Sequence, residues 1–157
     1  MSSLDIHDVP NLPQVPSHIS HLLNRLHAES IAQETNLTMD FNDPKCKDKL
    51  RDKAIAFDKD KAHFVYALCR AIDARTIVEA GTSFGLALVW IPVALTTLKL
   101  VQPRLRRGAV IVADSSAAHR DAYKEFFDHV RAPGSGFITQ TLPFRDGLEM
   151  MVYMPET

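Results

Sequence analysis

The chain has 157 residues, 46% hydrophobic and 24% charged, with a formal net charge of −1 at pH 7. These values are typical of one soluble globular domain and give no sign of a basic surface for nucleic acid or acidic membranes. The two cysteines, Cys46 and Cys69, match no metal-ligand spacing, and free thiols favour a reducing compartment. The sequence shows no secretory pattern, and its longest apolar stretch is too short for a bilayer, so we expect a cytoplasmic protein.

The first part of the chain predicts an arm and two helices. Residues 1–16 hold three prolines among polar residues, which is typical of a flexible arm. A helix capped by Ser17 should run to about Glu34, because apolar residues recur at helical spacing: Ile19, Leu22, Leu23, Leu26 and Ile31. A second, long helix should run from Pro44 to Cys69. Residues 17–74 then form the helical part of a single domain that spans residues 17–157.

The rest of the chain predicts a small sheet. Residues 75–81 and 108–114 are short apolar runs with glycine at one border, which predicts two buried parallel strands. An amphipathic helix should follow over residues 116–131. Residues 137–143 and 147–155 read as strands of a hairpin, with an Asp146-Gly147 turn. The predicted fold class is α/β, with two N-terminal helices, a few parallel strands and a C-terminal antiparallel hairpin.

Three segments, at residues 58–85, 94–114 and 142–155, carry a family resemblance: "DKDKAHFVYALCRAIDARTIVEAGTSFG", "ALTTLKLVQPRLRRGAVIVAD" and "LPFRDGLEMMVYMP". Together they resemble the S-adenosylmethionine-dependent small-molecule O-methyltransferases, particularly the catechol type. The resemblance implies a Rossmann-like fold whose first strand and glycine turn bind the methionine part of the cofactor. Glu79, Gly81 and Gly85 match that motif.

Relative to this family, the chain is internally shortened. Gly85 is followed directly by Leu86, where the family has the units that bind ribose and adenine. Of the family's three metal-ligand positions, only Asp114 keeps an acid, and one carboxylate cannot hold Mg²⁺. We therefore expect no metal and no cofactor, with S-adenosylmethionine as the alternative.

The junction at Leu86 also limits the topology. Adjacent parallel strands need a crossover of a dozen or more residues. We therefore expect residues 86–102 to form a crossover helix that starts or kinks at Pro92. The alternative is that residues 86–90 pair elsewhere, for example with another copy. The first strand of the sheet would then be an open edge, which predicts a homodimer through this edge or through the N-terminal helices.

Several side chains are candidates for chemistry. Asp114 follows a predicted strand, where open α/β sheets bind ligands, and it can act as an acid or base or cap the next helix. His119 and Tyr123 share a helix face and could transfer protons, with a solvated helix face as the alternative for His119. Three apolar residues are candidates for a substrate pocket, with packing in the core or a dimer as the alternative: Trp90, Phe144 and Met150. His63 on the second helix could also face that pocket, with an ordinary surface or interface role as the alternative.

These features favour a non-methylating enzyme on a shortened methyltransferase scaffold. It would cyclise or isomerise an apolar small molecule, such as a natural-product intermediate, without a metal. Two alternatives stay open: an S-adenosylmethionine-dependent O-methyltransferase completed by oligomerisation, and a non-catalytic accessory subunit of a full-length relative. The expected partners are a small-molecule substrate and a second copy, without nucleic acid or membrane.

Overall fold

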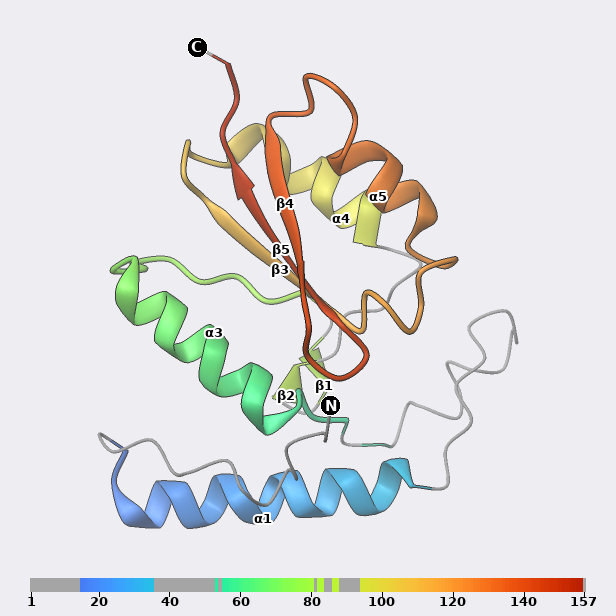
Figure 1. The fold of residues 1–157 in the computed structure, drawn as a ribbon. Coiled ribbons are helices and arrows are strands. Elements are labelled where there is room, and N and C mark those ends of the chain that lie inside the picture. The colour runs from blue at the N-terminus through green and yellow to red at the C-terminus, as the bar shows by residue number, and fades with distance from the viewer. Residues whose placement is uncertain are drawn as a thin grey trace. The chain divides into compact units, whose positions relative to one another are not determined.

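The computed structural model of the protein describes residues 15–35, 53, 55–80, 82–83, 86–87 and 94–156. By its internal contacts the chain divides into two compact units, Met1–Leu88 and Val89–Thr157. The first unit carries the blue and green elements of Figure 1, and the second carries the yellow to red ones. The division falls after residue 88, whereas the sequence placed the border between its helical and sheet-forming parts after residue 74.

Helix α1 opens the described part of the first unit. It covers Ser17–Glu34, which confirms the predicted helix, but no side chain caps it, so the predicted capping role of Ser17 is wrong. Its buried residues are two serines, Ser20 and Ser30. The apolar side chains of the predicted stripe remain 37–41% exposed: Ile19, Leu22, Leu23 and Ile31. The helix therefore buries a polar side and leaves much of its apolar surface accessible.

Helix α3 covers Lys59–Ala71. Residues 55–58 have no regular structure, so a continuous helix through them is wrong, and residues 44–52 lie outside the described residues. The ammonium of Lys61 is 1% exposed and lies 2.9 Å from the carboxylate of Asp58. A buried charge needs such a partner, and this pair joins the first turn of α3 to the extended residue before it.

The segment after α3 does not form the predicted strand. Residues 74–79 have no regular structure, and the side chains of Ile77 and Val78 are 70% and 78% exposed. A strand needs a neighbour for its backbone groups, and among the described residues none pairs with this segment. The short strands β1 (Thr82–Ser83) and β2 (Leu86–Ala87) pair antiparallel with each other instead.

The second unit alternates helices and strands. Its elements are α4 (Ala94–Val101), the 3-10 helix η3 (Gln102–Arg104), β3 (Val110–Asp114), α5 (Lys124–Val130), β4 (Phe137–Leu142) and β5 (Leu148–Tyr153). Of the helix predicted over residues 86–102, the structure describes the part from Ala94 to Val101, whereas Leu86 and Ala87 are in a strand. Residues 88–93, with the predicted start or kink at Pro92, lie outside the described residues. The helix predicted over residues 116–131 is also shorter, because residues 115–123 form successive turns.

The three strands form one antiparallel sheet in the order β3-β5-β4. The last strand along the chain is therefore the central one, with Val112 of β3 and Gln140 of β4 both opposite Met150. The predicted hairpin and the strand before it are confirmed. The predicted pair of parallel strands is wrong for the described residues, because residues 75–80 form no strand for β3 to join. The mixed α/β class is confirmed.

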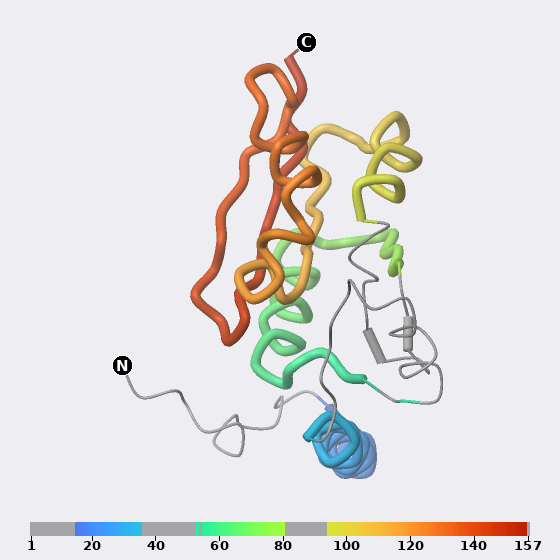
Figure 2. The backbone as a smooth tube through the Cα atoms, turned by 90° about the vertical axis from the view of Figure 1, so that its right-hand side faces the viewer, coloured from blue at the N-terminus to red at the C-terminus, as the bar shows by residue number. Residues whose placement is uncertain are grey.

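Helix α5 packs against the sheet, and α4 packs against α5 (Figures 1 and 2). An aromatic cluster links the turns after β3 to α5: the ring centroid of Tyr123 lies 5.6 Å from that of Phe126 and 5.5 Å from that of Phe127. All three side chains are buried, and each such burial stabilises the fold by about 1.5–3 kcal/mol. The turns that follow β3 are thus anchored to the core of this unit.

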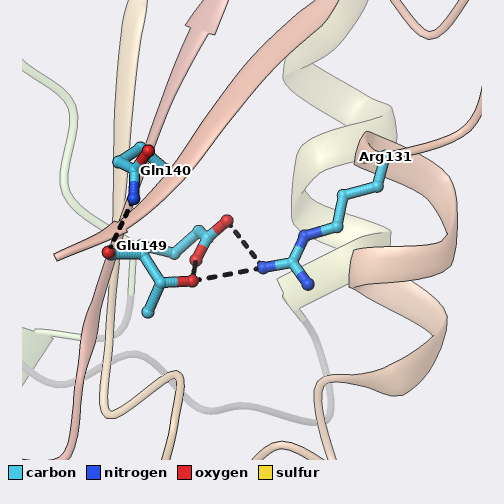
Figure 3. Close-up of polar contacts among 4 residues, drawn as sticks. Arg131, Gln140 and Glu149 are labelled. Carbon is cyan, nitrogen blue, oxygen red and sulfur yellow. Dashed lines mark hydrogen bonds and ion pairs between the residues drawn. The ribbon is translucent and has the colours of Figure 1, made fainter.

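A polar network joins the end of α5 to the hairpin (Figure 3). The carboxylate of Glu149 is fully buried on β5, and it accepts hydrogen bonds from Arg131 at 2.9 Å and from the Thr141 hydroxyl at 2.5 Å. The guanidinium of Arg131 also lies 4.1 Å from the centroid of the Phe127 ring, a cation–π contact. A buried carboxylate is therefore paired with a cation, as its desolvation requires.

Candidate functional site

The end of β3 and the turn of the β4–β5 hairpin meet in space. The backbone carbonyl of Asp146 accepts hydrogen bonds from the N–H groups of Ala117 at 2.8 Å and Ala118 at 3.1 Å. A Cβ placed on Gly147 would lie only 2.7 Å from the Cβ of Ala117. We call these two loops, residues 114–119 and 144–147, the loop cluster.

The hairpin loop, residues 143–147, is longer than the predicted tight turn, although its Asp146-Gly147 pair has the backbone that the sequence favours. Asp146 and Gly147 both have left-handed φ angles, of 59° and 80°. The N–H of Gly147 donates to the carbonyl of Phe144 at 2.9 Å, which closes the turn. The lack of a side chain at Gly147 is what allows the other loop to approach so closely.

His119 is the imidazole of the loop cluster, which also holds a guanidinium, that of Arg145, 3.8 Å from the carboxylate of Asp146. The backbone N–H of His119 donates to the carbonyl of Ser115 at 3.1 Å, which holds it on the turn directly after β3. Partial burial lowers the pKa of the His119 imidazole, and the negative charges of Asp146 and Asp114 oppose that shift without cancelling it. The ring is therefore neutral near pH 7 and can accept a proton, and two carboxylates are close enough to stabilise the imidazolium that forms.

Asp114 contributes both a side chain and a backbone carbonyl. Its Oδ1 accepts the N–H of the next residue, Ser115, at 2.7 Å. The predicted alternative that Asp114 caps the next helix is wrong, because that helix, α5, begins only at Lys124. The backbone carbonyl of Asp114 accepts the hydroxyl of Tyr123 at 3.0 Å. These two bonds hold the end of β3 against the turn that carries His119.

Tyr123 cannot meet a substrate in this arrangement. Its side chain is fully buried, and burial, helped by the charge of Asp114, raises the pKa of its hydroxyl far above the usual range. The hydroxyl instead donates to the end of β3. Tyr123 is therefore a positioning residue rather than the proton-transfer group that the sequence predicted.

The structure adds two members to the site that sequence reasoning missed, Asp146 and Ser116. Asp146 was read only as a turn residue, although its charge acts on His119. Ser116 is 1% exposed, and its Oγ has no hydrogen-bond partner among the described residues. Leaving such a hydroxyl unsatisfied costs about 1–3 kcal/mol, so it is an available donor within the loop cluster. Asp146 and Ser116 join the site only because two loops that are distant in the sequence make contact. No local sequence pattern predicts such a contact.

Two predicted pocket residues belong to the same unit. Phe144 lies in the hairpin turn, within the loop cluster. Met150 lies on β5, and Leu148, two residues earlier, is opposite Asp114. Because alternate residues of a strand share a face, Met150 and Asp114 lie on the same face of the sheet. The structure thus places three of the predicted residues, Asp114, His119 and Phe144, in the loop cluster, and Met150 on the sheet face that carries Asp114.

The other predicted residues are not in this unit or are not described. Glu79 is exposed in the irregular segment of the first unit, and Gly81, Gly85 and Trp90 lie outside the described residues. His63 lies on α3 of the first unit, where burial and the neighbouring charges of Lys59 and His27 lower its pKa, opposed by Asp60.

A shallow hollow of about 260 Å³ lies in the first unit, lined by Tyr66, Cys69, Arg70, Asp73, Ala74 and Ile77. None of the predicted site residues lines it. Within the described ranges, no three His, Cys, Asp or Glu side chains are placed to hold a metal ion. No helix in the described part of the chain is long and apolar enough to cross a membrane.

No protein-family model, curated protein or solved structure matches this chain. The likeness to the O-methyltransferases therefore stays a prediction from the three sequence segments that carry it. What the site can do follows from the loop cluster itself.

Proposed function

We propose that the chain is a proton-transfer enzyme that isomerises or cyclises a small apolar molecule, with His119 as its general base. The observation that carries the proposal is the environment of His119, a partly buried imidazole of lowered pKa near two carboxylates. An isomerisation needs a base that removes a proton from carbon and an acid that returns it elsewhere. Neutral imidazole performs the first step and the resulting imidazolium performs the second, with no oxidant or co-reactant.

The other residues of the loop cluster take supporting roles. The carboxylates of Asp114 and Asp146 stabilise the imidazolium while the proton is held. Phe144 and Met150 supply apolar surface for the substrate. Tyr123 positions the end of β3, because its hydroxyl bonds the carbonyl of Asp114.

The ancestry of the site is a separate proposal. We infer a remnant of a Rossmann-like methyltransferase domain, supported by strand β3 with its terminal Asp114 and by the C-terminal hairpin. The alternative functions are a methyltransferase completed by oligomerisation and a non-catalytic accessory subunit. We propose a cytoplasmic location for the protein. Calorimetry with S-adenosylmethionine separates the methyltransferase from our proposal, because micromolar binding would support the methyltransferase.

The base can be tested without the natural substrate. In 5-nitrobenzisoxazole, removal of one carbon-bound proton breaks the N–O bond and releases a coloured phenolate, with nothing else consumed. We expect the protein to accelerate this elimination by about 10²-fold over free imidazole, the lower end for a positioned base. His119→Ala should abolish the gain. His129→Ala is the matched control, because that imidazole lies on α5, 2.8 Å from Gln102. Equal rates for both variants would refute His119 as the base.

A further inference from the structure

The sheet of the second unit has an open side at β3. Strand β3 pairs with β5 along one side, and no strand within the described residues occupies the other. In an antiparallel ladder, successive residues direct their backbone groups alternately to the two sides. The N–H of Tyr153 donates to the carbonyl of Ala109 at 2.8 Å, so Ile111 and Ala113, two and four residues further on, direct their N–H and C=O groups toward β5. Before the strand the alternation does not hold, because the N–H of Ala109 bonds the carbonyl of Arg106 and the N–H of Gly108 bonds that of Tyr153.

Val110 and Val112 therefore direct their N–H and C=O groups away from the sheet. Asp114 follows the same alternation, since its carbonyl accepts the Tyr123 hydroxyl and not a group of β5. A row of outward backbone groups on an apolar edge strand is a template for a further strand.

The two ends of β3 carry opposite charges. Arg106 and Arg107 precede the strand, and Asp114 ends it. Arg106 is exposed, and its guanidinium has no partner in the described part of the chain, while Arg107 donates to the carbonyl of Pro155 at 2.7 Å. When two copies pair antiparallel, the basic end of each strand meets the acidic end of the other. A parallel pairing would place like charges together, which is unfavourable.

We propose that a second copy of the chain adds its β3 antiparallel to this edge, about a two-fold axis at Ile111. In this register Val110 of one copy pairs with Val112 of the other, so all the outward groups of both residues are bonded. Gly108 then lies opposite Asp114 of the other copy, and Arg106 and Arg107 lie within reach of that carboxylate. The interface is isologous and closes as a dimer with one continuous sheet. It is independent of the proton-transfer activity.

The mass in solution is the first test. Sedimentation equilibrium of the full chain from about 1 to 100 µM should give the mass of a dimer. Val112→Pro removes an outward N–H and leaves the ladder to β5 intact, so it should raise the dimer dissociation constant at least about tenfold. Thr139→Pro is the matched control, because Thr139 directs its N–H outward from β4, the opposite edge.

Other outcomes overturn the proposal. The proposal is wrong if the protein is a monomer throughout the concentration range. It is also wrong if Thr139→Pro abolishes the dimer while Val112→Pro retains it. The exposed apolar side of α1 is the competing surface, and Leu22→Glu tests it. A dimer broken by that change alone would place the interface on α1.

A cross-link keeps the proposal testable if Val112→Pro fails to fold. In the proposed register, Ile111 faces its own copy as a non-hydrogen-bonded pair with Cα atoms about 4.5 Å apart, within the range of a disulfide. In a background with Cys46→Ser and Cys69→Ser, Ile111→Cys should form a disulfide dimer on mild oxidation. Ile138→Cys on β4 should not, although that side chain is 63% exposed. Equal cross-linking at both positions, or none at Ile111→Cys, would exclude this register.

Discussion

The guanidinium of Arg131, just after α5, lies 2.9 Å from the fully buried carboxylate of Glu149 on β5. The two partners differ in exposure, because Arg131 is 38% exposed and Glu149 is not exposed at all. The ion pair therefore stabilises the fold chiefly because it supplies a cation to Glu149, whose buried carboxylate would otherwise be an unpaired charge.

Removal of Arg131 should destabilise the fold. Arg131→Met leaves Glu149 with only the Thr141 hydroxyl, so we expect a loss of about 2 kcal/mol, less than for a fully enclosed pair because water can reach the vacated site. Urea unfolding measures it. The double variant Arg131→Met/Glu149→Leu should recover most of the loss, because no buried charge remains. A single variant as stable as the parent would show that the contact contributes nothing.

The first unit should lose stability on acidification. Burial lowers the pKa of His27 on α1, with Lys59 adding to the shift and Asp58 opposing it. Burial likewise lowers the pKa of His63, with Lys59 and His27 adding and Asp60 opposing. The folded pKa values lie below the unfolded value of about 6.5, so the unfolded chain binds more protons. The two neutral histidines therefore make their full contribution to the free energy of unfolding above pH 6.5. This contribution is lost as the pH falls from 6.5 toward the folded pKa values.

Urea midpoints at pH 7.5 and pH 5, followed by circular dichroism, measure this loss. His27→Gln/His63→Gln should reduce the difference between the two midpoints. His18→Gln/His21→Gln is the control, since both side chains are exposed on α1. If the two double variants respond alike, the buried histidines are not the source.

The pH dependence of the elimination reports on His119. Because burial lowers its pKa, the rate should already be at its plateau at pH 7 and should fall only below about pH 6.5. The charge of Asp146 raises that pKa, so Asp146→Asn should move the midpoint to lower pH. Stopped-flow absorbance of the phenolate measures both profiles. A rate that still climbs above pH 8 would point to a different base.

Gly147 should tolerate no side chain. Its φ is 80°, and a Cβ would lie 2.7 Å from both the Cβ and the backbone nitrogen of Ala117. Gly147→Ala should cost about 3 kcal/mol, the sum of a strained backbone and overpacking. Gly134→Ala is the matched control, since its φ is 74° but nothing lies within 4 Å, and it should cost only about 1 kcal/mol. Equal losses in urea unfolding would mean that the two loops do not pack closely.

Tyr123→Phe separates positioning from catalysis. The variant keeps the buried ring and loses the hydrogen bond to the Asp114 carbonyl, so we expect a loss of about 1 kcal/mol in unfolding free energy. The elimination rate should stay within about twofold of the parent, because a buried hydroxyl does not reach the substrate. A large fall in rate with unchanged stability would instead return Tyr123 to the chemistry.

The strands of the second unit could be predicted from the sequence, because their residues show a clear strand pattern and the hairpin strands pair with a near neighbour in the chain. Phe137–Leu142 and Leu148–Tyr153 flank an Asp146-Gly147 turn, and a hairpin forms from contacts between near neighbours. Residues 75–81 show the opposite case. Thr76, Ile77 and Val78 favour a strand by themselves, but a strand needs a partner from elsewhere, and the described residues provide none.

The residues of the candidate site also fall into two groups, those that the sequence could predict and those that it could not. Asp114, His119 and Phe144 were identifiable from residue type and from their position after a strand or in a turn. Asp146 and Ser116 were not, because they join the site through the contact of two loops that are far apart in the sequence.

The amino-acid sequence by itself determined the α/β class, the strand Val110–Asp114, the closing hairpin and the helix Ser17–Glu34, since each rests on local periodicity and turn chemistry. Only the tertiary structure decided that β3 runs antiparallel to β5, with no described strand on its other side. The tertiary structure likewise decided that Tyr123 is enclosed while His119 lies near two carboxylates. Strand direction, burial and pKa depend on which distant segments meet, and that depends on the packing of the whole unit.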